Sequence, residues 1–144
     1  MLTSKKTVVV SGGFDPLHIG HIRMFKRARE LGDRLVVILN SDRFLLKKKG
    51  YVFMPFKERR EMIESIRFVD KVAPCIDKDQ TVCKTLEKLK PDVFANGGDR
   101  TKKNIPEDEV CQRLGIEMVF GVGGGKVQSS SWLVNDVKNK KNKK

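Results

Sequence analysis

The sequence predicts an α/β fold of the Rossmann-like, three-layer type, built on a five-stranded parallel sheet. Short runs rich in β-branched residues alternate with longer segments of helical periodicity along the whole chain. This alternation is typical of a parallel sheet that is covered by helices. No internal repeat or linker interrupts it, and 144 residues suit one domain. We therefore expect one domain over residues 1–137, followed by a lysine-rich flexible tail over residues 138–144.

The first half of the chain supplies three of the expected strands and two helices. Three consecutive valines after Thr7 indicate the first strand, and the uninterrupted apolar run that follows Arg34 indicates a buried central strand. Gly32 marks the end of the first helix, and Pro55 marks the start of the second. We expect strands over residues 6–11, 34–40 and 71–74, helices over residues 20–31 and 55–68, and a basic loop containing Lys47, Lys48 and Lys49.

The second half continues the same alternation. Apolar residues at core spacing predict helices, and Gly115 marks the end of one of them. A glycine-rich loop over residues 121–125 then leads to three serines that would cap a final helix. We expect helices over residues 81–89 and 106–114 and from residue 132 onward, and strands over residues 92–95 and 116–120.

The composition is that of a soluble globular protein, and the longest apolar runs are too short to cross a bilayer. The first residues lack the long apolar region of a signal peptide, so we expect a cytoplasmic protein with no membrane partner. Three cysteines, Cys75, Cys83 and Cys111, form no C-x-x-C pair. They indicate neither a disulfide framework nor a zinc site, and we expect them to be buried or half-buried packing residues.

The net charge of +12 raises the alternative of a basic nucleic-acid-binding module. Five of these charges, however, lie in the last seven residues, and the chain has one Trp and one Tyr. Such a composition does not provide a pattern of stacking aromatics for RNA. We therefore expect nucleic acid to bind only non-specifically, through the tail. A steep dependence of affinity on salt would distinguish a nucleic-acid binder from an enzyme.

The most informative segment contains the only two histidines, His18 and His21, just after the first strand and at the start of the first helix. Main-chain N–H groups in a glycine turn and the positive end of a helix dipole favour an anion. Imidazoles there can donate hydrogen bonds or supply positive charge to a phosphorus centre. We expect this segment to bind the phosphates of a nucleotide through Gly12, Gly13, Phe14, Asp15 and Gly20 in addition to the histidines.

Two further loops follow strands that would end at the same edge of the sheet, where ligands of such folds bind. One contains Gly97, Gly98, Asp99 and Arg100, which would approach the base or ribose. An ordinary turn is the alternative for this loop. The other loop leads to Ser129, Ser130 and Ser131, whose hydroxyls suit the β- and γ-phosphates. Simple helix capping is the alternative for these serines, although a cap needs only one hydroxyl.

The string from Gly12 to His21 resembles the HxGH signature of the nucleotidyltransferase superfamily, and most of all its cytidylyltransferase-like family. The resemblance extends from the first strand to the last helix. Within this family, the chain is similar both to glycerol-phosphate cytidylyltransferases and to sugar-phosphate adenylyltransferases. The chain departs from the family at three points: Gly13 stands for a threonine, Gln128 for an isoleucine, and Gly124 for the arginine that opens the family's last signature, so that this charge is missing. Lys126 is the candidate to replace that arginine.

The resemblance implies the Rossmann-like nucleotidyltransferase fold and transfer of a nucleotidyl group from a nucleoside triphosphate to a phosphorylated alcohol or sugar. CMP is the favoured group, and adenylyl transfer to heptose 1-phosphate or to flavin mononucleotide (FMN) is the alternative. His18 and His21 would stabilise the five-coordinate phosphorus, while Lys48 and Arg59 would hold phosphate charge. The resemblance also implies a homodimer and Mg²⁺ bound with the triphosphate, for which Asp15 is a candidate helper.

Overall fold

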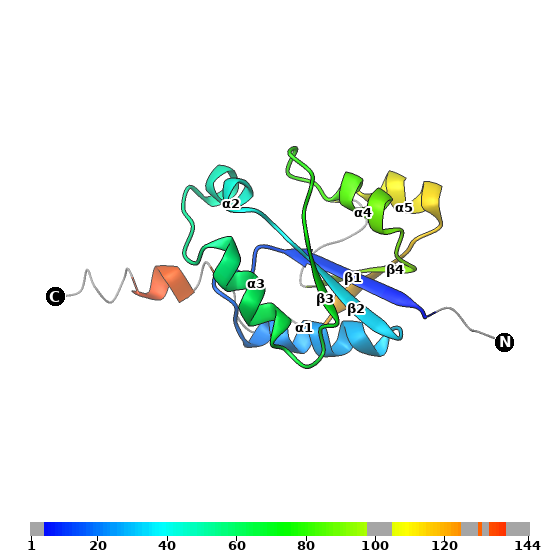
Figure 1. The fold of residues 1–144 in the computed structure, drawn as a ribbon, viewed down its shortest axis with the longest axis horizontal. Coiled ribbons are helices and arrows are strands. Elements are labelled where there is room, and N and C mark those ends of the chain that lie inside the picture. The colour runs from blue at the N-terminus through cyan, green and yellow to red at the C-terminus, as the bar shows by residue number, and fades with distance from the viewer. Residues whose placement is uncertain (1–4, 98–104, 125–129, 131–132, 138–144) are drawn as a thin grey trace.

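The computed structural model describes residues 5–97, 105–124, 130 and 133–137. These residues form a five-stranded parallel sheet in the order β3-β2-β1-β4-β5. Figure 1 shows the sheet with the helices around it. In chain order the elements are β1 (Thr7–Gly12), α1 (Ile19–Glu30), β2 (Arg34–Leu39), α2 (Asp42–Lys49), α3 (Phe56–Glu64), β3 (Lys71–Pro74), α4 (Cys83–Leu89), β4 (Val93–Gly97), α5 (Asp108–Leu114) and β5 (Glu117–Val122). The predicted fold class is confirmed.

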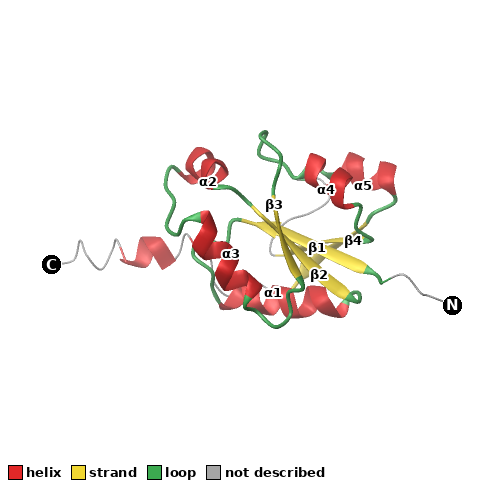
Figure 2. Cartoon of the chain, viewed as in Figure 1, coloured by secondary structure: helices red, strands yellow, loops and turns green. Residues whose placement is uncertain are grey.

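Helices cover both faces of the sheet, as Figure 2 shows, with α1 and α3 on one face and α4 and α5 on the other. Alternate residues of the central strands point to opposite faces. Val8 and Val10 therefore pack with Phe25 of α1, whereas Val9 packs with Leu86 of α4. The sheet thus separates two apolar cores, which is why β1 and β2 read as nearly continuous apolar runs.

The chain reverses its direction of travel across the sheet between β1 and β4. From β1 the chain proceeds outward through β2 to β3, and it then returns to place β4 on the other side of β1. Connections on the two sides of such a switch point diverge, and they leave a crevice at the carboxyl ends of the strands. Gly12, at the end of β1, is held to β2 there because its carbonyl accepts a hydrogen bond from the N–H of Asn40 at 3.0 Å.

All five predicted strands are present within two residues of their expected bounds. The basic loop expected around Lys48 is wrong, because Lys47, Lys48 and Lys49 form the last turn of α2. Ser41 caps this helix by accepting a hydrogen bond from Phe44 N, and Gly50 ends it in the left-handed region with φ 83°. Lysine is a good helix former, and these two residues supply the start and stop signals.

The three cysteines are free thiols in packed positions, as expected: Cys111 is buried, and Cys75 and Cys83 are half-buried. Burial is the main cause that raises the pKa of all three thiols, that of Cys111 to about 11. A thiol with a raised pKa is a poor nucleophile at neutral pH. Among the described residues, no helix combines the length and the apolar character that a membrane span requires.

Candidate active site

The turn between β1 and α1 is shaped by a strained aromatic residue, Phe14. Its φ of 51° lies in the left-handed region, which is rare for a bulky side chain. This backbone folds the ring inward, edge-on to His21 at 4.7 Å and to Phe25 at 5.2 Å between ring centroids. A Cβ on Gly12 would lie 2.9 Å from the Phe14 ring, so this position requires glycine. The turn therefore holds the second histidine against the core.

His18 and His21 form a reciprocal cap at the start of α1. Nδ1 of His18 accepts a hydrogen bond from Gly20 N at 3.0 Å, and Nδ1 of His21 accepts one from His18 N at 3.2 Å. A neutral imidazole has one accepting and one donating nitrogen. The observed contacts assign the accepting role to Nδ1 in both rings, and they leave the proton of each neutral ring on Nε2.

The two imidazoles stack, with centroids 3.7 Å apart and planes inclined by 24°. The pKa of His21 is lowered to about 3, chiefly because the ring is buried, with smaller contributions in the same direction from His18 and Lys49. His21 is therefore neutral at physiological pH. Its chemistry at a phosphate is that of a hydrogen-bond donor through Nε2–H, one of the two modes the sequence allowed.

Asp15 fastens the turn to the connection between α2 and α3. Its carboxylate is fully buried and accepts hydrogen bonds from Phe53 N at 2.6 Å and from Met54 N at 2.5 Å. Both oxygens are thus used in holding the main chain. The role expected from the sequence, a helper ligand for Mg²⁺, does not match this arrangement, and the structure gives Asp15 a positioning role.

Arg59 is the largest fully buried side chain, and its guanidinium makes four hydrogen bonds within the protein. It donates to Met54 O, Gly13 O and Asn40 O, each at 2.8 Å, and to the Asp42 carboxylate at 2.6 Å. With 0% exposure, the Arg59 side chain is not placed to meet a phosphate in this structure. It clamps the β1 turn, the end of β2 and the α2–α3 connection together, a positioning role that differs from the phosphate contact expected from the sequence.

Of the two adjacent lysines Lys48 and Lys49, it is Lys49 whose charge acts on His21. Lys48 is exposed, and its Nζ lies 5.8 Å from the centroid of the Phe44 ring. Lys49 is half-buried, and its Nζ donates to Asp15 O at 3.1 Å. Burial is the main cause that lowers the pKa of Lys49, and Lys48 and Arg59 lower it in addition. The sequence analysis selected Lys48 because it expected a loop here. In the helix α2, the rotation from one residue to the next turns Lys49, and not Lys48, toward the histidine turn.

The expected convergence of the strand-end loops is present where the structure describes them. Gly97, at the end of β4, and Gly123, just after β5, both approach Met24 of α1 so closely that an added Cβ would lie 2.8 Å and 3.1 Å from it. The Ser130 hydroxyl donates a hydrogen bond to Pro16 O at 2.7 Å, across 114 residues of sequence. The other predicted site residues lie outside the described residues: Gly98, Asp99, Arg100, Lys126, Ser129 and Ser131.

Asn40 is a further candidate that the sequence did not indicate. It is buried at the end of β2, and its side-chain oxygen has no hydrogen-bond partner within the described part of the chain. A buried acceptor without a partner is costly, and a ligand N–H or O–H can relieve that cost. The only sequence signal was its place directly after a buried strand at the ligand edge.

No group of three or more His, Cys, Asp or Glu side chains that could hold a metal ion is found in the described ranges. The described residues of the site supply hydrogen-bond donors and positive charge. Two imidazoles whose Nδ1 atoms accept main-chain N–H groups, an ammonium group and the positive end of α1 surround the carboxyl end of β1. Such a set can stabilise negative charge that develops on a phosphate.

Comparisons with known proteins agree with this geometry. A family model described as cytidylyltransferase-like matches residues 9–122. FAD synthase of Pyrococcus abyssi is 44% identical over 112 residues, 77% of this chain and 75% of that protein. Glycerol-3-phosphate cytidylyltransferase of Staphylococcus aureus is 34% identical over 123 residues, 85% of this chain and 92% of that protein.

A solved structure, that of a lipopolysaccharide core biosynthesis protein from Thermoplasma volcanium, superposes with a TM-score of 0.70 at 26% identity. The match covers 81% of this chain and 96% of that one. The matched family region contains the histidine turn and all the carboxyl strand ends around it. The chain therefore belongs to the cytidylyltransferase-like family and is a nucleotidyltransferase.

Proposed function

We propose that this nucleotidyltransferase transfers an adenylyl group from ATP to the phosphate of FMN. The observation that supports this pair is the 44% identity to FAD synthase of Pyrococcus abyssi. Transfer of CMP to glycerol 3-phosphate is the second candidate; the sequence motifs favoured CMP as the group and a phosphorylated alcohol or sugar as the acceptor. It is supported by the match to glycerol-3-phosphate cytidylyltransferase, which covers 92% of that protein.

In either reaction, a phosphate oxygen of the acceptor attacks the α-phosphorus of the triphosphate in line. A new P–O bond forms as the bond from the α-phosphorus to the bridging oxygen of the β-phosphate breaks, and pyrophosphate leaves with that electron pair. The attacking phosphate is already ionised at neutral pH, so the step needs no general base. Catalysis then consists of positioning and of charge stabilisation at the five-coordinate phosphorus.

The stacked histidines carry this mechanism. With Nδ1 of each ring accepting a main-chain N–H, each neutral imidazole offers its Nε2–H to oxygens of the α-phosphate. Lys49, fixed beside the same turn through Asp15 O, supplies the positive charge. Asp15 and Arg59 do not touch the substrate in this proposal. They hold the turn in place, which is how a preformed site avoids reorganisation during the reaction.

Nucleotidyltransferases of this kind generally use a divalent metal with the triphosphate. We propose that Mg²⁺ enters as part of the Mg²⁺–triphosphate substrate, because Mg²⁺ keeps several waters and needs few protein ligands. The buried Asp15 carboxylate, with both oxygens bound to main-chain N–H groups, does not fit the role of its ligand. No step of the mechanism is assigned to a protein-held metal.

A pyrophosphate-release assay with ATP or CTP, each combined with FMN or glycerol 3-phosphate, tests the proposal. We expect turnover with ATP and FMN, and loss of that turnover in His18→Asn. Turnover only with CTP and glycerol 3-phosphate would replace the first candidate by the second. Pyrophosphate release that is equal in wild type and His18→Asn would contradict the histidine mechanism for both pairs.

Two further expectations of the sequence remain proposals. One is a homodimer, which sedimentation velocity of the full chain would test. The other is non-specific nucleic-acid binding through residues 138–144. Retention on heparin should fall when the chain is cut after residue 137, since five lysines are removed.

A further inference from the structure

An open groove, here called the α3 groove, lies on the outer face of α3 beside the histidine turn. It has a volume of about 520 Å³. Its lining residues are Leu17, Glu58, Glu61, Met62 and Ser65. Leu17 directly precedes His18, and the other four follow one another along α3 and its end at spacings of three, one and three residues. Residues at this spacing share one face of a helix.

The α3 groove combines apolar surface with negative charge. Leu17 is half-buried against the core, and Met62 is 43% exposed. Glu58 and Glu61 are exposed, and neither forms an ion pair with another described residue. The remaining acid of α3, Glu64, is paired within the helix. The groove therefore presents an apolar floor between two carboxylates that no described cation neutralises.

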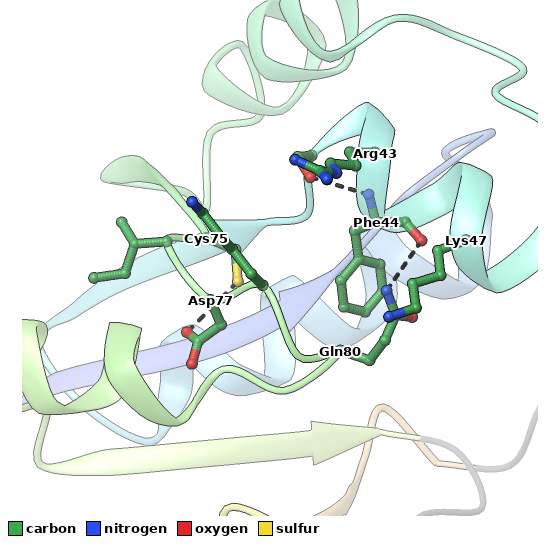
Figure 3. A pocket seen from close by; sticks show the side chains of 9 residues that line it. Arg43, Phe44, Lys47, Cys75, Asp77 and Gln80 are labelled. Carbon is green, nitrogen blue, oxygen red and sulfur yellow. Dashed lines mark hydrogen bonds between the residues drawn. The ribbon is translucent and has the colours of Figure 1, made fainter.

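This negative charge stands out in a chain whose net charge is +12. Other carboxylates are used inside the fold. The Asp77 carboxylate, which Figure 3 shows beside Cys75, accepts hydrogen bonds from Thr85 N at 3.0 Å and from the Thr85 hydroxyl at 2.6 Å. Asp42 is paired with the buried Arg59. The α3 groove is different, because its carboxylates face solvent and attract a cationic partner.

The chain itself contains a matching cationic segment. Residues 138–144 hold five lysines and no acid. The segment is attached next to the α3 groove, because the Ser130 hydroxyl donates to Pro16 O at 2.7 Å and Pro16 is followed directly by Leu17. Residues 133–137 are helical, so the chain advances about 1.5 Å per residue there. Seven extended residues then span up to about 25 Å, which is enough to return to the groove.

The chemistry of the segment fits both parts of the α3 groove. Val137 directly precedes the lysines and is 65% exposed, so an apolar side chain is available for the floor. Lysine stems can pack on apolar surface such as Met62 while their ammonium groups reach the carboxylates. Surface ion pairs are individually weak. Attachment to the same chain compensates for this, because tethering raises the local concentration of a segment to the order of millimolar.

We propose that residues 138–144 bind in the α3 groove of the same chain. The bound segment covers the outer side of the turn that carries His18, and no step of nucleotidyl transfer is assigned to it. The proposal does not depend on which nucleotide or acceptor the enzyme uses.

Carbodiimide cross-linking of the full chain tests the proposal, because this reagent joins a carboxylate to an amine that contacts it. We expect a link from Glu58 or Glu61 to a lysine of residues 138–144, in protein that migrates as a single chain. Salt at about 1 M screens surface charges and should remove the link. Cleavage before aspartate releases residues 136–144 as one peptide for mass spectrometry. Absence of the link would overturn the proposal, and links only between two chains would overturn it by assigning the groove to a second copy.

Lysine acylation, followed by mass spectrometry, gives a second measurement in the variant Glu58→Gln/Glu61→Gln. The lysines of residues 138–144 should react at least about threefold faster than in wild type, the scale of two weak surface ion pairs. Glutamine is as good a helix former as glutamate, so α3 should persist. Glu109→Gln/Glu117→Gln removes the same charge from exposed positions of α5 and β5 and should react as wild type. Equal rates in all three proteins, or an equal rise in both variants, would contradict a specific contact with the α3 groove.

Discussion

The main-chain N–H of His18 donates to Nδ1 of His21 at 3.2 Å, while Nδ1 of His18 accepts from Gly20 N at 3.0 Å. The two ring nitrogens of each histidine thus have different roles. Nδ1 stabilises the start of α1, and Nε2 is the donor proposed to meet the substrate. A substitution that keeps an acceptor at the position of Nδ1 but removes the Nε2–H donor can separate capping of the helix from catalysis.

His18→Asn makes that separation. The Asn side-chain oxygen can accept from Gly20 N as an N-cap, so the free energy of unfolding should stay within about 0.5 kcal/mol of wild type. Removal of the Nε2–H donor should lower kcat by on the order of 10²-fold. His18→Ala should show the same loss of kcat and a further cost of about 1 kcal/mol in stability. Urea unfolding and pyrophosphate release measure the two quantities; a His18→Asn variant with wild-type kcat would disprove the donor role.

The pH dependence of stability should report the depressed pKa of His21. In the unfolded chain its pKa is near 6.5, and in the folded protein it is about 3. Below pH 6.5 the unfolded state therefore binds a proton that the folded state does not, so stability falls as pH falls. The slope should reach about 1.4 kcal/mol per pH unit between these two values.

His21→Gln isolates this effect from the titration of carboxylates. Urea unfolding of both proteins between pH 4 and pH 8 should show the wild type losing stability relative to the variant below about pH 6.5. Because the free enzyme already has neutral His21, kcat/KM should also show no loss from its deprotonation near pH 6.5. Parallel stability curves for the two proteins would refute the depressed pKa.

Lys49 and Lys48 form a matched pair of adjacent charges with different surroundings. Lys49→Ala should lower kcat/KM by about ten- to a hundredfold, the scale for a lost contact between a charged donor and a phosphate. Lys48→Ala removes the same charge from an exposed position and should change kcat/KM by less than about threefold. Steady-state kinetics at constant ionic strength decides between them. A larger loss in Lys48→Ala would restore the sequence-based assignment.

Arg59→Ala should destabilise the fold as well as reduce activity. It removes a buried guanidinium that serves three carbonyls and the Asp42 carboxylate, and such losses cost about 3–5 kcal/mol. Arg59→Lys keeps the charge but cannot span the four acceptors, so its cost should be intermediate. Urea unfolding measures both. Wild-type stability with lost activity in Arg59→Ala would instead indicate a direct phosphate contact.

The histidine turn and the alternation of strands and helices were accessible from sequence because they are local signals. Alternating apolar runs identify strands, and the strand-glycine-helix string around His18 needs no distant partner. The roles of Asp15 and Arg59 could not be obtained this way. Asp15 bonds to main chain 38 and 39 residues away, and Arg59 bonds to Gly13 O 46 residues away. Only the folded chain shows that their charges are used internally.

The same limit applies to Ser130. Sequence patterns predict that its hydroxyl donates to a triphosphate, but a serine hydroxyl has one hydrogen to donate. In the structure that hydrogen is directed to Pro16 O at 2.7 Å, which fastens the last helical segment to the histidine turn. The hydroxyl is therefore placed to hold the turn, and phosphate contacts are left to Ser129 and Ser131 within the proposal.

Ser130→Ala tests this assignment. Loss of one hydrogen bond to a half-buried carbonyl should lower the free energy of unfolding by about 0.5–1.5 kcal/mol. The Kd for the triphosphate should change by less than about threefold, since no donor to the phosphates is removed. Ser129→Ala and Ser131→Ala should weaken triphosphate binding by about tenfold or more, with stability nearly unchanged. Urea unfolding and equilibrium titration with ATP or CTP in the three variants provide the comparison. If Ser130→Ala loses triphosphate affinity to the same extent as the other two, its hydroxyl leaves Pro16 when the nucleotide binds, and the original phosphate role is correct.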